Sequence, residues 1–135
     1  MSRINVEAGG VSFAIELNDS ATSKAILGAL PFESRAQTWG EEVYFSTPVK
    51  AALEKDARQV VEAGTVCFWT EGDALALPYG RTPISTDERP KLASRCNVLG
   101  KLVGDPKRLA AVRSGEPVTV ERAPEGAAEG AVDGS

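Results

Sequence analysis

The feature that most constrains this chain is a two-residue alternation of apolar and polar side chains in short runs. In residues 3–7 the apolar positions are Ile4 and Val6, and in residues 11–17 every second residue is again apolar. This period places all apolar side chains of a run on one face of a β-strand. Because Gly9-Gly10 between the runs favours a turn, the pattern predicts an N-terminal β-hairpin.

The same pattern predicts further strands along the chain. We expect strands over 42–45, 97–103 and 117–122, an extended chain over 32–48, and a second hairpin made by 66–69 and 74–79. Two short helices interrupt them. One is predicted over 20–29, after the capping cluster Asn18-Asp19-Ser20, and the other opens at Asp105-Pro106. Residues 53–64 are ambiguous, because their apolar spacing alone favours a helix.

Length and charge limit the classes of protein to which the chain can belong. The 135 residues suffice for one domain, and 42% of them are hydrophobic. The 15 basic and 19 acidic residues give a net charge of −4, but three of those acids lie in 123–135, which leaves 16 acids against 15 bases elsewhere. We therefore predict a folded domain over 1–122 and a disordered acidic tail over 123–135. The near-neutral domain carries no basic stripe, so nucleic acid is not an expected partner.

No run of apolar residues is long enough to span a membrane, and the N-terminus has no apolar segment typical of a secretory signal. A cytoplasmic location with no membrane partner is the resulting expectation. The chain has no histidine, which excludes Ser-His-Asp and Cys-His catalysis and every histidine zinc site. Cys67 and Cys96 are not spaced as a redox pair, so we expect two buried structural thiols. No metal-binding loop or phosphate-binding GK[ST] motif is present, and no metal or cofactor is predicted.

Five segments, taken in order, resemble a family of small prokaryotic proteins with a cyclophilin-like fold. They are 16–20 with Leu30-Pro31, 39–45, 64–69 with 72–74, 80–85, and 97–101. The resemblance covers roughly residues 3–122 and implies a mainly β fold: a closed antiparallel eight-stranded cyclophilin-like barrel with two short helices. It also implies that 53–64 is extended or irregular rather than helical. Arg81 departs from the family pattern, which tends to have Gly-Pro-Thr-Pro where this chain has Gly80-Arg81-Thr82-Pro83.

Candidate ligand-binding residues fall into three groups. Arg35, Gln37 and Trp39 share one face of an extended segment because they are two residues apart. Alternatively, Trp39 is a packing residue and Arg35 pairs with Glu41 or Glu42. If Val43 and Phe45 point inward, Glu42 and Tyr44 share the outer face, where Glu42 is expected to be a solvated charge. A buried Glu42 would instead indicate a site, because a carboxylate is costly to bury without a partner.

The other candidates lie on the second hairpin and the loop after it. Trp69 and Tyr79 are either core residues or pocket residues, since each joins an apolar ring to a polar tip. Arg81, Thr82 and Ser85 offer a guanidinium, hydroxyls and backbone N–H groups that can hold an anion or a peptide carbonyl. The alternative for this loop is a turn made rigid by Pro83.

Three functions are compatible with these residues. The preferred hypothesis is a binding module that holds a small molecule or short peptide near Arg35, Trp39, Tyr44, Trp69 and residues 81–85. The second is a peptidyl-prolyl isomerase in which Arg35 polarises the amide. The third is a structural or assembly role through an exposed edge of the barrel. Fold alone does not choose among them, and the sequence predicts neither the ligand nor the oligomeric state.

Overall fold

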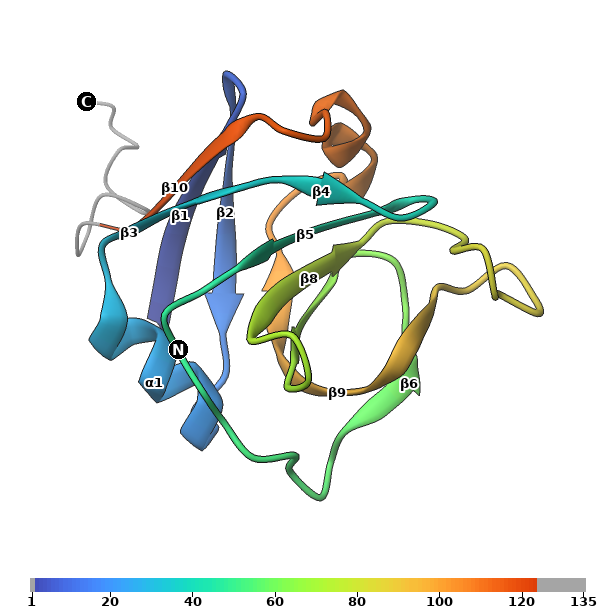
Figure 1. The fold of residues 1–135 in the computed structure, drawn as a ribbon, viewed down its shortest axis with the longest axis horizontal. Helices are drawn as coiled ribbons and strands as arrows, with labels where there is room; N and C mark the ends of the chain where they lie inside the picture. The colour runs from blue at the N-terminus through green and yellow to red at the C-terminus, as the bar shows by residue number, and fades with distance from the viewer. Residues whose placement is uncertain (1, 124–135) are drawn as a thin grey trace.

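The computed structural model of the chain describes residues 2–123, which form ten strands, one α-helix and one 3-10 helix (Figure 1). The strands are β1 (Ser2–Ala8), β2 (Val11–Leu17), β3 (Phe32–Arg35), β4 (Gln37–Thr38), β5 (Glu42–Ser46), β6 (Arg58–Val60), β7 (Thr65–Trp69), β8 (Ala74–Pro78), β9 (Lys91–Leu102) and β10 (Pro117–Arg122). The helices are α1 (Ala21–Ala29) and η1 (Pro106–Ala111).

Both predicted hairpins are present. In the first, β1 pairs with β2 so that Ile4 lies opposite Ile15 and Val6 opposite Phe13, and all four side chains are buried. The turn uses Gly9 and Gly10, whose φ angles of 55° and 89° lie in the region that favours glycine. In the second hairpin, β7 pairs with β8. The alternation in the sequence therefore sets which faces of the strands are buried.

The strands form a closed barrel in the order β3-β10-β1-β2-β9-β7-β8-β5-β4. The two ends of this order, β3 and β4, are consecutive in the chain and separated only by Ala36, so residues 32–38 pass from β10 on one side to β5 on the other. The predicted closed antiparallel barrel is confirmed. The path contains nine strands rather than eight, because Ala36 divides one continuous extended segment into two.

The two helices lie beside opposite ends of the β1–β2 hairpin (Figure 1). Each places an apolar side chain in the main core, Ile26 from α1 and Leu109 from η1. Ser20 caps α1 by accepting a hydrogen bond from the Ser23 amide, and Asp105 caps η1 by accepting one from the Lys107 amide. Both helix starts agree with the sequence prediction.

A second apolar cluster lies apart from the main core and centres on Cys67, Ala76, Leu92 and Cys96. It sits on the outer side of the barrel wall, because the neighbouring residues Val66, Phe68, Leu75 and Leu77 point into the main core. Strand β9 belongs to both regions. Its later residues pair with β2 and β7, whereas its earlier residues extend beyond the wall and pair with β6.

Residues 53–64 are extended or irregular and contain β6. This agrees with the family resemblance, whereas the apolar spacing of the segment had favoured a helix. The buried Asn97 explains part of this outcome. Its side chain accepts a hydrogen bond from the Glu54 amide at 2.7 Å and donates to the Ala52 carbonyl at 2.9 Å and the Thr22 hydroxyl at 3.0 Å. These bonds attach residues 52–54 to β9, so tertiary contacts override the local pattern at the start of this segment.

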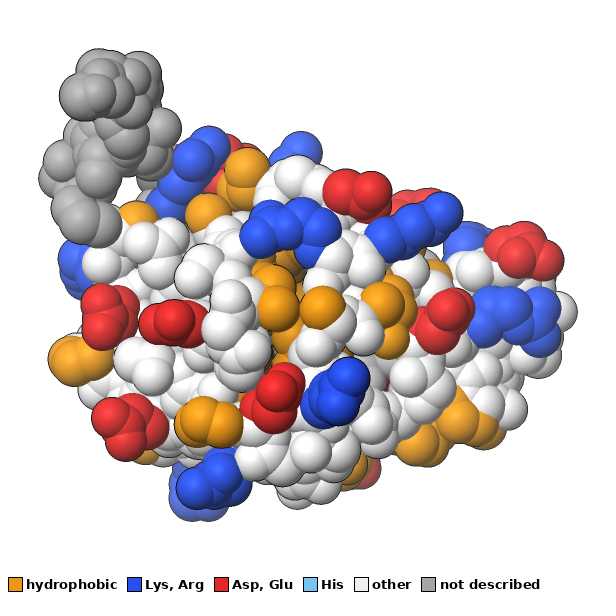
Figure 2. Space-filling model, turned by 90° about the horizontal axis from the view of Figure 1, so that it is seen from above, with side chains coloured by type: hydrophobic (Ala, Val, Ile, Leu, Met, Phe, Trp, Pro, Cys, Tyr) orange, Lys and Arg blue, Asp and Glu red, His pale blue; other side chains and the backbone are white. Residues whose placement is uncertain are grey.

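Charges of both signs are interspersed on the face seen from above, without a large patch of either sign (Figure 2). None of the helices within residues 2–123 is long and apolar enough to cross a membrane. The predicted acidic tail, 123–135, lies outside the described residues except for Ala123, whose amide donates to the Arg3 carbonyl.

Candidate functional site

Strand β5 carries the centre of the candidate site on its outer face. Val43 and Phe45 point into the main core, so Glu42 and Tyr44 point the other way, toward the second apolar cluster. The preceding turn is closed by a hydrogen bond from the Trp39 amide to the Glu42 carbonyl, with Gly40 at a φ of 61°. This turn brings Trp39 to the same side as Glu42 and Tyr44.

These side chains line a cavity of about 240 Å³ on the outside of the barrel wall. Its residues come from the turn before β5 and from β5, β7, β8 and β9: Trp39, Glu42, Tyr44, Trp69, Ala76, Leu92, Ala93 and Cys96. Seven of the eight are apolar or aromatic. The structure therefore brings together four residues that the sequence singled out, Trp39, Glu42, Tyr44 and Trp69.

Two of the aromatic rings are held in fixed positions. Tyr44 and Trp69 meet edge to face, with ring centroids 6.3 Å apart and planes at 88°. The Trp69 indole N–H donates to the Ser94 hydroxyl at 3.0 Å, and the Tyr44 hydroxyl donates to Gln37 Oε1 at 3.2 Å. Gly72 lies so close to the Trp69 ring that a Cβ there would collide with it. The walls of the cavity are thus fixed by neighbours outside it.

Glu42 is the polar group of the cavity, and the expectation that it is a solvated charge is wrong. Its residue surface is only 7% exposed. Among the buried side-chain oxygen and nitrogen atoms of residues 2–123, Glu42 Oε1 is the one without a hydrogen-bond partner. Burial disfavours the charged form and raises the pKa of Glu42 to about 7. The carboxyl group can therefore exchange a proton near neutral pH.

Cys96 lines the cavity, and Cys67 belongs to the same apolar cluster. Both are buried free thiols, as predicted. Burial, together with the nearby Glu42 carboxylate, raises the pKa of Cys96 to about 12, and burial raises that of Cys67 still further. Since the thiolate is the reactive form of cysteine, this environment suppresses nucleophilic chemistry and makes Cys96 an apolar wall residue.

Arg35 and Gln37 lie away from the cavity lining. Arg35 is exposed on β3, and its guanidinium donates to the Gly115 carbonyl at 2.9 Å. It pairs with neither Glu41 nor Glu42, so that alternative is wrong. The proposed isomerase role of Arg35 requires a guanidinium beside a bound proline, and this arrangement does not supply one at the cavity. Gln37 reaches the cavity only indirectly, through its hydrogen bond with Tyr44.

Residues 81–85 form a loop that is held together by its own side chains. The Ser85 hydroxyl accepts hydrogen bonds from the Thr82 amide at 3.0 Å and the Lys91 amide at 3.1 Å. The Thr82 hydroxyl donates to the Lys91 carbonyl, and the Arg81 amide donates to Glu41 Oε1. These groups fix the start of β9 and do not line the cavity. Tyr79 likewise packs against the main core.

Sequence reasoning did not include Ala76, Leu92, Ala93 and Cys96 among the cavity residues. Ala76 lies in β8, within the predicted strand 74–79, and the other three lie at the start of β9, in residues 91–96, for which no strand or helix was predicted. Small and aliphatic residues in strands are typical of packing, and nothing in their pattern distinguishes a core wall from a cavity wall. Only the curvature of β9 away from the barrel brings Leu92 and Cys96 opposite Glu42.

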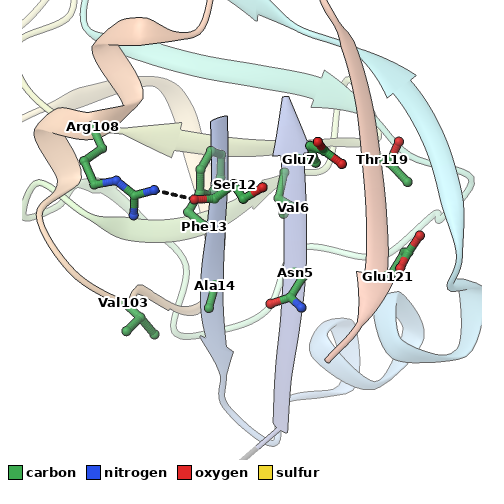
Figure 3. Close-up of a pocket in the computed structure, with 10 residues that line it drawn as sticks. All are labelled: Asn5, Val6, Glu7, Ser12, Phe13, Ala14, Val103, Arg108, Thr119 and Glu121. Atoms are coloured by element: carbon green, nitrogen blue, oxygen red, sulfur yellow. Dashed lines mark hydrogen bonds between the residues drawn. The ribbon is translucent and has the colours of Figure 1, made fainter. Parts of the chain in front are cut away.

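A wider depression, of about 500 Å³, lies over β1, β2 and β10 (Figure 3). Its rim carries Glu7, Thr119 and Glu121, and Arg108 reaches across from η1 to the Ser12 carbonyl. Within the part of the chain that the structure describes, no side chain lining this depression is a buried polar group without a hydrogen-bond partner. The cavity beside Glu42 is smaller but encloses a buried carboxyl group, and it is therefore the stronger candidate site.

The fold and cavity define a small closed antiparallel β-barrel protein with an aromatic cavity on the outer side of its wall. In residues 2–123, no three Cys, Asp or Glu side chains are grouped so that they could hold a metal ion. A model of the cyclophilin-like family matches residues 2–121, and the chain belongs to that family.

Among solved structures, the chain is similar to a hypothetical protein of Archaeoglobus fulgidus known from its solution structure. The two are 37% identical, the match covers 90% of this chain and 95% of that one, and the TM-score is 0.77. A comparison with curated proteins gave no significant match. These similarities agree with the family resemblance and with the barrel fold.

Proposed function

We propose that this protein is a binding module that holds a small molecule, or one side chain of a short peptide, in the cavity beside Glu42. The observation that carries the proposal is the unpartnered, buried carboxyl group in an otherwise apolar cavity. Such a group costs folding free energy. A bound ligand that pairs with Glu42 would offset this cost, so ligand binding accounts for the presence of the buried carboxyl group.

The size of the cavity supports a compact ligand. Drug-sized molecules occupy pockets of roughly 300–1,000 Å³, and this cavity is about 240 Å³. One ring or one side chain fits this space, and the aromatic walls provide apolar contact.

Tryptophan fluorescence tests the proposal directly, because both tryptophans of the chain, Trp39 and Trp69, line the cavity. We would titrate the protein with cyclohexanol, cyclohexylamine and cyclohexanecarboxylate, which share one apolar body and differ in charge. At least one of these probes should change the emission in a saturable manner. If none of the three does so, the proposed binding role is refuted.

A matched pair of variants assigns the change to the cavity. Ala76→Leu adds three carbon atoms to the cavity wall and should abolish the response, whereas Ala14→Leu makes the same change on the outer face of β2, away from the cavity. Ala14→Leu should respond like the unmodified protein. A response that survives Ala76→Leu unchanged would place binding elsewhere.

A further inference from the structure

We propose that the cavity selects a compact organic cation: an alkylammonium group on a small apolar body, presented by a free amine or by a peptide side chain. This inference rests on the binding role proposed above and specifies the chemistry of the ligand. It follows from three properties of the lining residues: their hydrogen-bonding capacity, their aromatic faces and their charge.

The buried hydrogen-bonding groups of the cavity call for a ligand that donates. The Trp69 N–H is committed to Ser94, the Tyr44 hydroxyl to Gln37, and the Cys96 thiol to the Ser94 carbonyl. The buried group left without a partner, within the part of the chain that the structure describes, is the acceptor atom Glu42 Oε1. A carboxylate only accepts hydrogen bonds, so the complementary ligand supplies N–H or O–H donors.

The aromatic residues favour a positive charge on that donor. Trp39, Tyr44 and Trp69 contribute three of the eight lining residues. The faces of such rings attract cations, with tryptophan the strongest, and sites of this kind recognise ammonium groups. An anionic ligand would be repelled by the Glu42 carboxylate, which lines the same cavity.

The cavity contains no cation of its own, because none of its eight lining residues is lysine or arginine. The titratable groups that face Glu42 are Tyr44 on the same strand, Cys67 on β7 and Cys96 on β9. All three are neutral or negative in every protonation state. Ionised Glu42 therefore lacks a counter-charge, and a bound ammonium group would supply it. A buried charge pair offsets its desolvation only when its geometry is good and its remaining hydrogen bonds are satisfied.

Binding of a cation should consequently depend on pH. Burial raises the pKa of Glu42 to about 7, and only the ionised carboxylate forms the charge pair. An alkylammonium ion stays protonated throughout the relevant range. The affinity for the amine should therefore rise with pH, by roughly tenfold between about pH 6 and about pH 8. A neutral ligand that accepts a hydrogen bond from the protonated Glu42 carboxyl group would show the opposite trend.

The experiment compares cyclohexylamine with cyclohexanol, its neutral counterpart of the same shape, by tryptophan fluorescence at several pH values. We expect the amine to bind at least tenfold more tightly than the alcohol at about pH 8, with the amine affinity falling as the pH is lowered. Equal affinities, tighter binding of cyclohexanecarboxylate, or an amine affinity that does not change with pH would overturn the inference. If the alcohol or the carboxylate binds in those cases, the binding role proposed above still stands and only the preference for a cation is refuted.

Glu42→Gln separates the charge of the carboxylate from its shape. This variant should lose the preference for cyclohexylamine over cyclohexanol and lose the pH dependence. An unchanged preference in the variant would refute the assignment to Glu42. The pH series on the unmodified protein tests the inference independently of this variant.

The source of the ammonium group is resolved by a second pair of probes, N-acetyl-lysinamide and N-acetyl-norleucinamide. If the natural ligand is a peptide side chain, the lysine compound should bind more tightly than cyclohexylamine. If it is a free amine, cyclohexylamine should bind more tightly. In both cases the neutral norleucine compound should bind more weakly than its lysine counterpart. Norleucine binding as tightly as lysine would contradict recognition of the cation.

Discussion

Replacing Glu42 by glutamine should change how the stability of the protein depends on pH. The ordinary pKa of a glutamate is 4.5, and in the folded protein burial raises that of Glu42 to about 7. Between these values the folded state holds a proton that the unfolded state has lost. The stability contributed by this proton is complete below the unfolded-state pKa and declines as the pH rises through the folded-state pKa.

The magnitude follows from the two pKa values. Between them the free energy of unfolding falls by about 1.4 kcal/mol per pH unit, which amounts to roughly 2.5 kcal/mol between about pH 5 and about pH 8. Glu42→Gln removes this term. The variant should therefore gain stability relative to the unmodified protein by that amount over the same range. Any fixed cost of burying the amide shifts the comparison equally at every pH.

Urea unfolding, followed by circular dichroism at a series of pH values, measures this difference. Glu41→Gln is the matched control, because Glu41 is the adjacent residue, is exposed and loses the same formal charge. A constant difference between Glu42→Gln and the unmodified protein from about pH 5 to about pH 8 would refute the reasoning that the buried carboxyl group titrates near neutrality.

Three further substitutions or reagents test the surroundings of the cavity and the helix start. Cys67 and Cys96 should not react with a thiol reagent in the native protein, because burial raises the pKa of both thiols, and both should react once urea unfolds the chain; rapid reaction without urea would contradict this. Gly72→Ala places a Cβ against the Trp69 ring, so it should shift the tryptophan emission and destabilise the fold by about 1–3 kcal/mol; an unchanged spectrum would count against the close contact. Ser20→Ala removes the helix cap and should cost about 1 kcal/mol in urea unfolding, and a cost near zero would mean that solvent replaces the cap.

Much of the fold could be predicted from local pattern. The alternation in 3–7 and 11–17 determines which side chains are buried, and Gly9-Gly10 determines the turn. Closure of the barrel could not be predicted in this way. It depends on residues 32–38 changing partners at Ala36, which is a long-range event with no local signature. Residues 53–64 show the same limit, because Asn97, which is distant in the sequence, binds the chain at residues 52–54.

The candidate site was predicted in part, for a physical reason. The outward orientation of Glu42 and Tyr44 follows from the strand period once Val43 and Phe45 are placed inside. Whether an outward side chain meets water or another layer depends on what covers it. Here the early part of β9 covers the outer face, so Glu42 is buried although its strand position is that of a surface residue.

The continuity of β9 ties the ligand cavity to the integrity of the whole barrel. Strand β9 contributes Leu92 and Cys96 to the cavity wall, and its later residues pair with β7 and β2. Displacing this wall would strain the adjoining pairs of β9 with β7, which begin at Asn97. Ala93 is the exposed residue of the cavity lining. We expect solutes to enter beside it, with uptake that is fast compared with amide hydrogen exchange along β9.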